Sequence, residues 1–334
     1  SSMKTLPLYA GLDVAQEFTV GTVVDEMGNA VRELKVPTNE QGYERLFFDL
    51  QNVTAVFEAG RNWSYIASLL KPYCAFKMAH PLKVRLIASA RIKTDEIDSR
   101  TLAHLLRANL IPESYMPPEE TVELRNLVRY RVRLGRMAAH LKNRTHAILA
   151  REGHKSEFKP YEKKAKLWIQ SLKMNPVNRD ELEYSLKLLD ELKSKIKELD
   201  ELLEKERVKY PQADLLTTIP GISTYSALLI LAEVGDFSRF PTADKLAAYS
   251  GLVSSTYQSG STCYQGRITK QGNTWLRWML TQCTHASVKK RHRLQKFYLR
   301  IKHRRGTQKA ITATARKMLT TMWYMLRNNE AYRG

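Results

Sequence analysis

Cysteine and long apolar runs are scarce in this sequence. Three cysteines occur in 334 residues, and none belongs to a CxxC pair. A disulfide framework and a structural zinc site therefore lack the residues they need. No apolar stretch approaches the roughly 20 residues of a membrane-spanning helix, and no signal peptide opens the sequence. We therefore expect an intracellular protein with no membrane partner.

Negative charge is also in short supply. The chain has 54 Lys and Arg against 34 Asp and Glu, a net charge of +20. Basic side chains that neutralise phosphates release condensed counterions, so this excess favours a polyanionic partner. We expect that partner to be nucleic acid, and the location to be cytoplasmic and associated with a prokaryotic nucleoid. No zinc finger, homeodomain-like segment or basic zipper is present to read a base sequence.

Residues 1–117 alternate strand-like and helix-like segments. Three β-branched or aromatic runs come first, and two more follow with helical segments around them. This order predicts a mixed sheet covered by helices, the α/β part of the fold. The five predicted strands are LYAGLDVA (8–15), EFTVGTVVDE (17–26), AVRELKVP (30–37), TAVFEAG (54–60) and CAFKMAH (74–80).

Residues 118–210 contain only helical patterns. Long helices are predicted over 119–150 and 180–209. In the second, leucines and one isoleucine repeat as a heptad seam flanked by Lys and Glu, which predicts a coiled-coil arm. The seam is either packed within one chain or shared between protomers. We favour the second alternative, because long exposed seams usually need a partner helix. The seam residues are Leu182, Leu189, Leu192, Ile196, Leu199 and Leu203.

Residues 211–334 form the third predicted domain, which is all-α. Its first segment, LLTTIPGISTYSALLILAEVG, is similar to a helix-hairpin-helix, in which a glycine turn presents N–H groups to a phosphate. Ser223 occupies the position where the second glycine of that motif usually stands. A polar loop over 255–273 and further helices follow, including the basic stretch 289–305.

Four carboxylates are candidates for a metal site. Asp13 lies in an otherwise apolar strand, where burial of a carboxylate is costly unless it is paired or bound. Glu58 ends a later strand, and Asp95 and Asp98 are spaced to share one face at a helix start. Together they could hold hard cations, for which oxygen ligands are suited. Taken singly, each of the last three has a simpler interpretation as a helix cap or a charge that complements the helix dipole.

The segments GLDVA, FEAG and KTDEIDSRTLAHLL together resemble the DEDD transposases of the insertion sequence 110 type. The downstream segments IPGISTYSALLILAEVGDFSRFPTADKLAAYSGL, YQSGS and GRITKQGNTWLR are similar to the C-terminal transposase domain of that family. Two departures occur: Gln16 stands where lysine is common, and EAGRNW replaces the more usual Glu-Ala-Thr-Gly. The resemblance implies a RuvC-like fold for residues 1–117.

The resemblance also implies a chemistry and partners. Mg²⁺ would be held by Asp13, Glu58, Asp95 and Asp98, and Ser259 would attack a DNA phosphodiester to give a covalent phosphoserine link. From its own sequence context Ser259 is only a turn residue, and Ser261 is a competing nucleophile. Some members of the family use a structured noncoding bridge RNA that pairs with donor and target DNA. Ser259 and Asp98 are far apart in the chain, so the two sites must meet by folding back or across protomers of a homodimer or tetramer.

Basic residues near both proposed sites are candidate phosphate contacts. Gly266 and Gly272 accompany some of them and would allow a close backbone approach. These candidates are Arg125, Arg129, Arg133, Arg267, Lys270, Arg277, Lys289, Lys290 and Arg291.

We therefore predict an RNA-guided DNA recombinase. One rival is a RuvC-like junction resolvase or nuclease, in which two metal ions activate water and Ser259 is structural. The other is a nucleic-acid-binding architectural protein whose acids are only caps.

Overall fold

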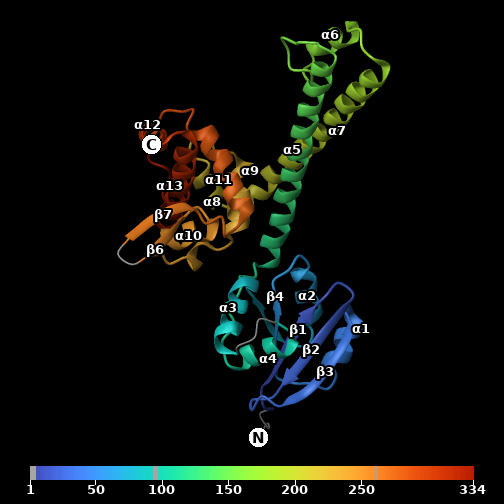
Figure 1. The fold of residues 1–334 in the computed structure, drawn as a ribbon, viewed down its shortest axis with the longest axis vertical. Coiled ribbons are helices and arrows are strands. Elements are labelled where there is room, and N and C mark those ends of the chain that lie inside the picture. Colours follow the sequence, from blue (N-terminus) through green and yellow to red (C-terminus); the bar gives the residue numbers. More distant parts are fainter. Residues whose placement is uncertain (1–4, 93–96, 260–261) are drawn as a thin grey trace. The chain divides into compact units, whose positions relative to one another are not determined.

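The computed structural model describes residues 5–92, 97–259 and 262–334. The chain divides into two compact units, Ser1–Met116 and Pro117–Gly334, each of which is considered by itself (Figure 1). Within the described ranges, no helix has the length and apolar character needed to cross a membrane.

The first unit is built on a five-stranded mixed sheet with the order β3-β2-β1-β4-β5. Antiparallel pairing joins β1, β2 and β3, and parallel pairing joins β1 to β4 and β4 to β5. The mixed sheet predicted from the sequence is therefore confirmed. The strands are β1 (Leu8–Val14), β2 (Phe18–Val24), β3 (Ala30–Pro37), β4 (Val53–Glu58) and β5 (Ala75–Ala79).

Helices cover both faces of this sheet. On one face α1 (Glu40–Phe47) and α2 (Trp63–Leu70) pack against Leu12 and Phe57. On the other, α3 (Pro81–Arg91) and α4 (Ser99–Arg107) pack against Val56. The two apolar clusters are separate because neighbouring residues of a strand point to opposite faces.

Helix α4 lies directly on β1 at Gly11. A Cβ at this position would meet the backbone carbonyl oxygen of Ser99 at 2.0 Å, so only glycine allows this approach. Next to it, the hydroxyls of Thr22 and Ser99 share a 2.7 Å hydrogen bond. These contacts hold the start of α4 against β1 at Gly11, which lies two residues before Asp13 on the same strand.

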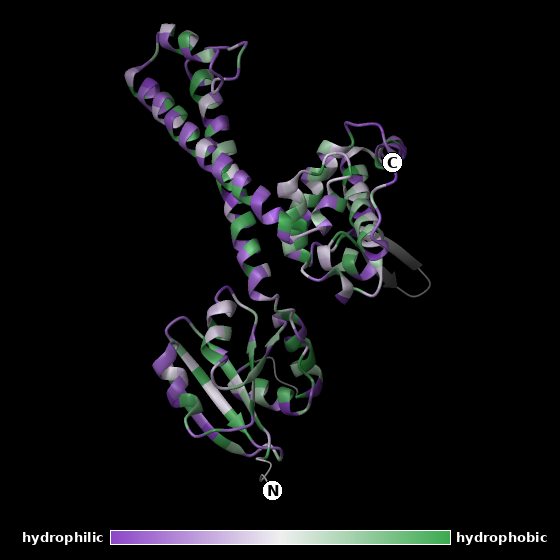
Figure 2. Ribbon diagram, turned by 180° about the vertical axis from the view of Figure 1, so that it is seen from behind, coloured by the Kyte–Doolittle hydropathy of each residue, from purple (hydrophilic) through white to green (hydrophobic). Residues whose placement is uncertain are grey.

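Two long antiparallel helices begin the second unit. Helix α5 (Glu119–Arg151) packs against α7 (Pro176–Glu206), with α6 (Ala165–Ser171) between them in the chain (Figure 1). Arg131 is paired with Asp200 at 2.7 Å, and Arg151 with Glu181 at 2.8 Å. In Figure 2 hydrophilic residues predominate in the parts of α5 and α7 nearest α6.

The seam of α7 is largely buried within this same chain. Leu182 packs with Ile148 and Leu149, and Leu203 packs with Leu124 and Val128 of α5. The seam was expected to be exposed and therefore shared between protomers; that expectation of exposure is wrong, because α5 already covers the seam. The expectation of a dimer or tetramer has no support from this feature.

The rest of the second unit is a helical domain with a large apolar core. Helices α9 and α13 each contribute more buried residues to that core than any other element, and α12 packs beside α13. The remaining elements are η1 (Arg207–Lys209), α8 (Gln212–Leu216), α9 (Thr224–Val234), η2 (Phe237–Arg239), α10 (Ala243–Ser250), β6 (Ser254–Ser259), β7 (Thr262–Ile268), α11 (Thr274–Ser287), α12 (Arg293–Arg305) and α13 (Thr307–Asn328).

One expectation for this domain needs correction, and one stays a prediction. Residues 255–273 are not a simple loop, since β6 and β7 form an antiparallel hairpin within them. At the helix-hairpin-helix-like segment, Gly221 faces the protein: a Cβ there would lie 2.6 Å from the backbone nitrogen of Ser287. Ser223 caps α9 by accepting from the N–H of Ser226. The turn is thus packed on α11 at Gly221, and the helix-hairpin-helix remains a prediction.

Candidate active site and nucleic-acid contacts

Asp13 and Glu58 lie side by side at one end of the sheet. The last paired residues of β1 and β4 are Leu12 and Phe57, and the two acids are the next residues of these parallel strands. Leu12 and Phe57 point into the core beneath α1 and α2, so both acids point to the opposite face. Strand pairing therefore brings together two carboxylates that are distant in sequence.

Glu58 is a buried acceptor without a partner. Its Oε1 atom is inaccessible to solvent and has no hydrogen bond. Burial raises the pKa of Glu58, the nearby Arg85 guanidinium lowers it, and the Asp13 carboxylate raises it. An unsatisfied carboxylate oxygen beside a second carboxylate is costly in the protein alone. This donor set fits a hard cation.

Asp13 itself is exposed, contrary to the expectation of a buried strand carboxylate. It lies one residue from the end of β1, where the sheet opens to solvent. The sequence context suggested burial because both neighbours are apolar. Only the position of the strand end decides that its side chain reaches water.

Asp98 performs the simpler role that the sequence allowed. It is the N-cap of α4, and its Oδ1 accepts from the backbone N–H of Thr101 at 2.8 Å. The helix begins at Ser99, so Asp98 lies immediately before its first residue. One carboxylate oxygen of Asp98 is used by the cap, and the position of α4 on Gly11 keeps Asp98 near β1.

Asp95 lies outside the described residues. Within 5–92, 97–259 and 262–334, no three or more His, Cys, Asp or Glu side chains are grouped closely enough to hold a metal ion. Asp13, Glu58 and Asp98 are among these described residues, and Asp95 is not. The four-carboxylate site remains a prediction.

Ser259 is the last residue of β6. Its backbone is paired with Thr262, the first residue of β7, and Tyr257 is paired with Tyr264. The hairpin therefore places Ser259 next to its connection, residues 260–261. Ser261, the competing nucleophile, lies outside the described residues.

The base of this hairpin is clamped to the helical domain. Arg277 donates to the carbonyl of Ser250 at 3.1 Å. A Cβ at Gly272 would lie 2.3 Å from the carbonyl oxygen of Tyr249, so the close approach that we expected at this glycine is to the protein's own backbone. Ser255 donates to the carbonyl of Arg267 at 2.8 Å. These contacts make Arg277 and Gly272 structural elements of the hairpin base.

Two of the predicted phosphate contacts, Arg125 and Arg129, are engaged inside the protein. Arg125 donates to the carbonyls of Ala232 and Glu233 at the end of α9. Arg129 forms two hydrogen bonds, of 2.6 and 2.7 Å, with the Glu233 carboxylate, which is fully buried. Asn273 donates to the same carboxylate at 2.8 Å. These partners give both arginines a structural role.

Glu233 was missed by the sequence reasoning. It joins α5, α9 and α11 through the contacts just described. Its signal was a single acid in the apolar run LLILAEV, which predicts a buried helix and therefore a paired carboxylate.

The other predicted contacts are exposed to solvent. Arg133 lies over the ring of Trp275, 5.5 Å from its centroid. Arg267 lies on β7, and Lys270 follows it with a positive φ of 54°. Lys289, Lys290 and Arg291 lie between α11 and α12. These six side chains remain predicted phosphate contacts.

The first unit is an α/β unit with two neighbouring carboxylates, Asp13 and Glu58, at one end of its sheet. The second is a basic helical unit whose β6–β7 hairpin carries Ser259. Two family models match the chain: the DEDD transposase model of the IS110 type over residues 10–152, and the Transposase IS116/IS110/IS902 family over residues 213–299. Together they cover more than half of the sequence. The chain belongs to the IS110 family of DEDD transposases.

Similar proteins carry names from the same family. A transposase for insertion sequence element IS1111A of Coxiella burnetii is 33% identical over 120 residues, 35% of this chain and 33% of the relative. A pilin gene-inverting protein of Moraxella bovis is 35% identical over 124 residues, 36% of this chain and 38% of the relative. An IS110 insertion-element protein of Streptomyces coelicolor is 30% identical over 124 residues, 37% of this chain and 31% of the relative. The match thus spans about a third of each relative's length.

Proposed function

We propose that this chain is a DNA transposase that cleaves and rejoins strands through a serine nucleophile and a magnesium-binding carboxylate site. The observation that carries the proposal is the unpartnered, buried Oε1 of Glu58 beside Asp13. A buried carboxylate with a purely structural role is expected to be hydrogen-bonded within the protein, as Glu233 is.

The residues proposed to hold Mg²⁺ are Asp13, Glu58, Asp95 and Asp98. When bound, the ion would neutralise charge that develops on the phosphodiester oxygens. Asp13 and Glu58 orient their carboxylates because their strands are paired in parallel. Asp98 keeps its place by capping α4, which leaves one carboxylate oxygen for another contact.

Ser259 is proposed to carry the covalent step. Its hydroxyl oxygen forms a bond to phosphorus and loses its proton, while the bond from phosphorus to one strand oxygen breaks and that oxygen takes up a proton. The strand is then held as a phosphoserine ester. Attack by a hydroxyl of another strand reverses these changes, so the phosphodiester energy is kept and strands are rejoined.

A structured noncoding RNA is proposed as the guide. The chain has a net charge of +20 and no recognisable sequence-reading motif. These features suit a protein that holds polyanions by their backbones and leaves sequence choice to base pairing. RNA recovered with the purified protein tests this directly: one defined species supports guiding, and random fragments contradict it.

Trapping of the covalent ester tests the chemistry. Nicked DNA bearing a label next to the cleavage site is incubated with the protein and Mg²⁺, and products are separated under denaturing conditions. We expect a labelled protein–DNA adduct that is absent for Ser259→Ala and present for Ser261→Ala, the matched control two residues away.

A hydrolytic nuclease gives a different result. It releases cleaved DNA without any adduct, and Ser259→Ala leaves its rate unchanged. An architectural protein gives neither adduct nor cleavage. Either outcome excludes the serine mechanism.

A further inference from the structure

A basic groove lies between α12 and α13 near the chain's end, in the second unit. Its volume is about 710 Å³. One wall is a face of α12, the other a face of α13, and the tail 330–333 closes one end. Figure 1 shows the C-terminus beside α12, and Tyr332 fixes it there by hydrogen bonding to His292 at 3.0 Å. We refer to this hollow as the α12–α13 groove.

Four cations line the α12–α13 groove without a carboxylate partner. Arg293, Lys296 and Arg300 recur at helical spacing on one face of α12, and Lys317 faces them from α13. None of the four takes part in an ion pair among the described residues. The only acid of the lining, Glu330, is paired with Arg333 at 3.2 Å. The groove therefore has a strong unbalanced positive charge.

Aromatic rings accompany these cations. Phe297 has the guanidinium carbon of Arg300 5.3 Å and the Nζ of Lys317 6.0 Å from its ring centroid. Tyr324 is 57% exposed, a large fraction for a ring that lines a hollow. The ring of Tyr324 packs edge-on against that of Trp323, with 4.9 Å between the ring centroids, and this contact orients the Tyr324 ring. A planar apolar ligand can stack on Tyr324 while its charged part contacts the cations.

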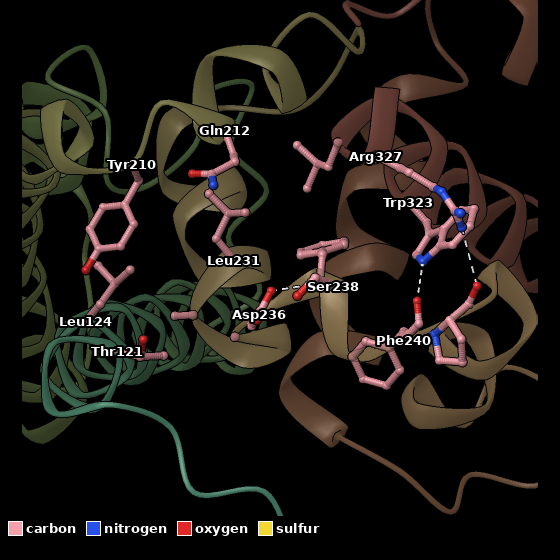
Figure 3. A pocket seen from close by; sticks show the side chains of 15 residues that line it. Thr121, Leu124, Tyr210, Gln212, Leu231, Asp236, Ser238, Phe240, Trp323 and Arg327 are labelled. Atoms are coloured by element: carbon pink, nitrogen blue, oxygen red, sulfur yellow. Dashed lines mark hydrogen bonds between the residues drawn. The ribbon is translucent and has the colours of Figure 1, made fainter. Parts of the chain in front are cut away.

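A second hollow of similar size in this unit differs in how its charged side chains are engaged. It has a volume of about 660 Å³ and lies where the start of α5, the end of α9, η2 and the end of α13 meet (Figure 3). Its one cation, Arg327, lies 4.8 Å from the centroid of Trp323 and donates to the carbonyl of Pro241. Asp236 accepts from the N–H of Ser238. Its charged groups are thus used within the protein, unlike those of the α12–α13 groove.

We propose that the α12–α13 groove binds single-stranded nucleic acid. Arg293, Lys296, Arg300 and Lys317 contact the phosphates, and the exposed ring of Tyr324 stacks on an unpaired base. Free cations alone would suit any polyanion; the exposed ring among them selects a strand whose bases are not already paired. This inference rests on the proposed function for its partner, since either a guide RNA or a displaced DNA strand supplies such a ligand.

Binding of labelled oligonucleotides by the full chain tests the phosphate contacts. The groove variant Lys296→Gln/Arg300→Gln/Lys317→Gln is compared with Arg304→Gln/Arg305→Gln/Lys309→Gln, which removes the same charge from exposed positions of the same two helices outside the groove. Fluorescence anisotropy is measured with single-stranded RNA, single-stranded DNA and duplex DNA of one sequence. We expect the groove variant to lose about 10- to 100-fold in affinity for single strands at 0.1 M salt. The slope of the logarithm of the binding constant against the logarithm of the salt concentration should become smaller in magnitude by about 2.

The control variant is expected to lose less than about threefold. Equal losses in the two variants, or a loss confined to duplex DNA, overturn the proposal. A loss for RNA alone identifies a guide strand as the ligand, and a loss for both single strands identifies the shared backbone and bases.

The stacking contact has its own test. Tyr324→Leu is expected to weaken binding of a normal single strand by about five- to tenfold, while Tyr324→Phe binds like the wild type. An abasic strand of equal length should not distinguish the three proteins. Equal weakening with the abasic strand contradicts stacking.

The proposed function can fail independently of this groove. If the groove variant binds single strands like the wild type but still forms the serine adduct, only the groove is wrong. If the wild type forms no adduct, and the groove variant binds single strands more weakly than the wild type, the serine chemistry is wrong and the groove proposal holds.

Discussion

Two glutamates show how the two units of this protein use buried charge. Glu58 ends a central strand of the first unit, and Glu233 lies near the end of a buried helix in the second. Glu233 is enclosed and receives hydrogen bonds from Arg129 and Asn273. Glu58 is partly buried, has one oxygen without any partner and has Asp13 as its neighbour.

The difference separates structural charge from candidate functional charge. A satisfied buried ion pair fixes how helices pack, and removing one partner leaves the other costly. An unsatisfied carboxylate beside a second one destabilises the fold and persists only where something else binds it. The four predictions below test this contrast through the stability of the folded protein.

The largest effect is expected at Glu233. Glu233→Gln leaves the Arg129 guanidinium without its countercharge in a half-buried site, so we expect a loss of about 3–5 kcal/mol in unfolding free energy. Urea denaturation followed by tryptophan fluorescence measures this, because four of the five tryptophans belong to the second unit. Asp214→Asn, which breaks the exposed pair with Arg207, is the control and should cost less than about 1 kcal/mol.

A small effect at Glu233 would mean that this carboxylate does not organise the helices. Glu58 would then no longer stand out, since both acids would tolerate neutralisation equally.

Glu58 is expected to behave in the opposite way. Burial raises the pKa of its carboxyl above the ordinary value of 4.5, so the folded unit favours the protonated form. The stability linked to that proton is present at low pH and is lost as pH rises through the raised pKa. Glu58→Gln should therefore not destabilise the unit at neutral pH, and should remove this pH dependence.

Binding of Mg²⁺ should offset the destabilisation caused by the unpartnered Glu58 carboxylate. Binding to the folded state alone stabilises by about 2.7 kcal/mol at a hundredfold excess over the dissociation constant. We expect wild type and Glu233→Gln to gain stability with Mg²⁺ in thermal denaturation, and Glu58→Gln to gain none. A magnesium response that survives Glu58→Gln contradicts the proposed site.

The smallest effect is expected at Asp98, whose two roles can be separated. Asn caps a helix as well as Asp does, whereas Ala does not, so Asp98→Ala should lose about 1 kcal/mol and Asp98→Asn almost nothing. In the adduct assay both variants should lose activity, because both lack the charge. Full activity of Asp98→Asn would leave Asp98 with the cap alone.

The fold of the first unit was largely predictable. Its five strands follow from β-branched runs bounded by turn residues, and the observed strands agree to within a few residues. The hairpin β6–β7 was not predicted, because its sequence is polar and rich in Gly and Ser, as loops are. Pairing of its two strands outweighs their weak individual preference.

The site was predictable only as a set of candidates. An acid at the end of an apolar strand can be identified from sequence, as Asp13 and Glu58 were. Which arginines are free cannot be identified in this way, since Arg125 and Arg129 look like any basic residue of an amphipathic helix. Their partners, at the end of α9, are more than a hundred positions away in the chain.

Composition and local pattern by themselves determined that this protein is basic, that it joins an α/β unit to helices, and which acids are candidates for a metal site; Ser259 became a candidate only through the family resemblance. These properties depend on residues close together in sequence, where side-chain period and turn chemistry act. Tertiary structure alone decided that Asp13 and Glu58 adjoin, that Arg129 is occupied by Glu233, and that the cations of α12 and α13 remain free. Such properties depend on contacts between distant segments, and burial and partners exist only once these segments have packed.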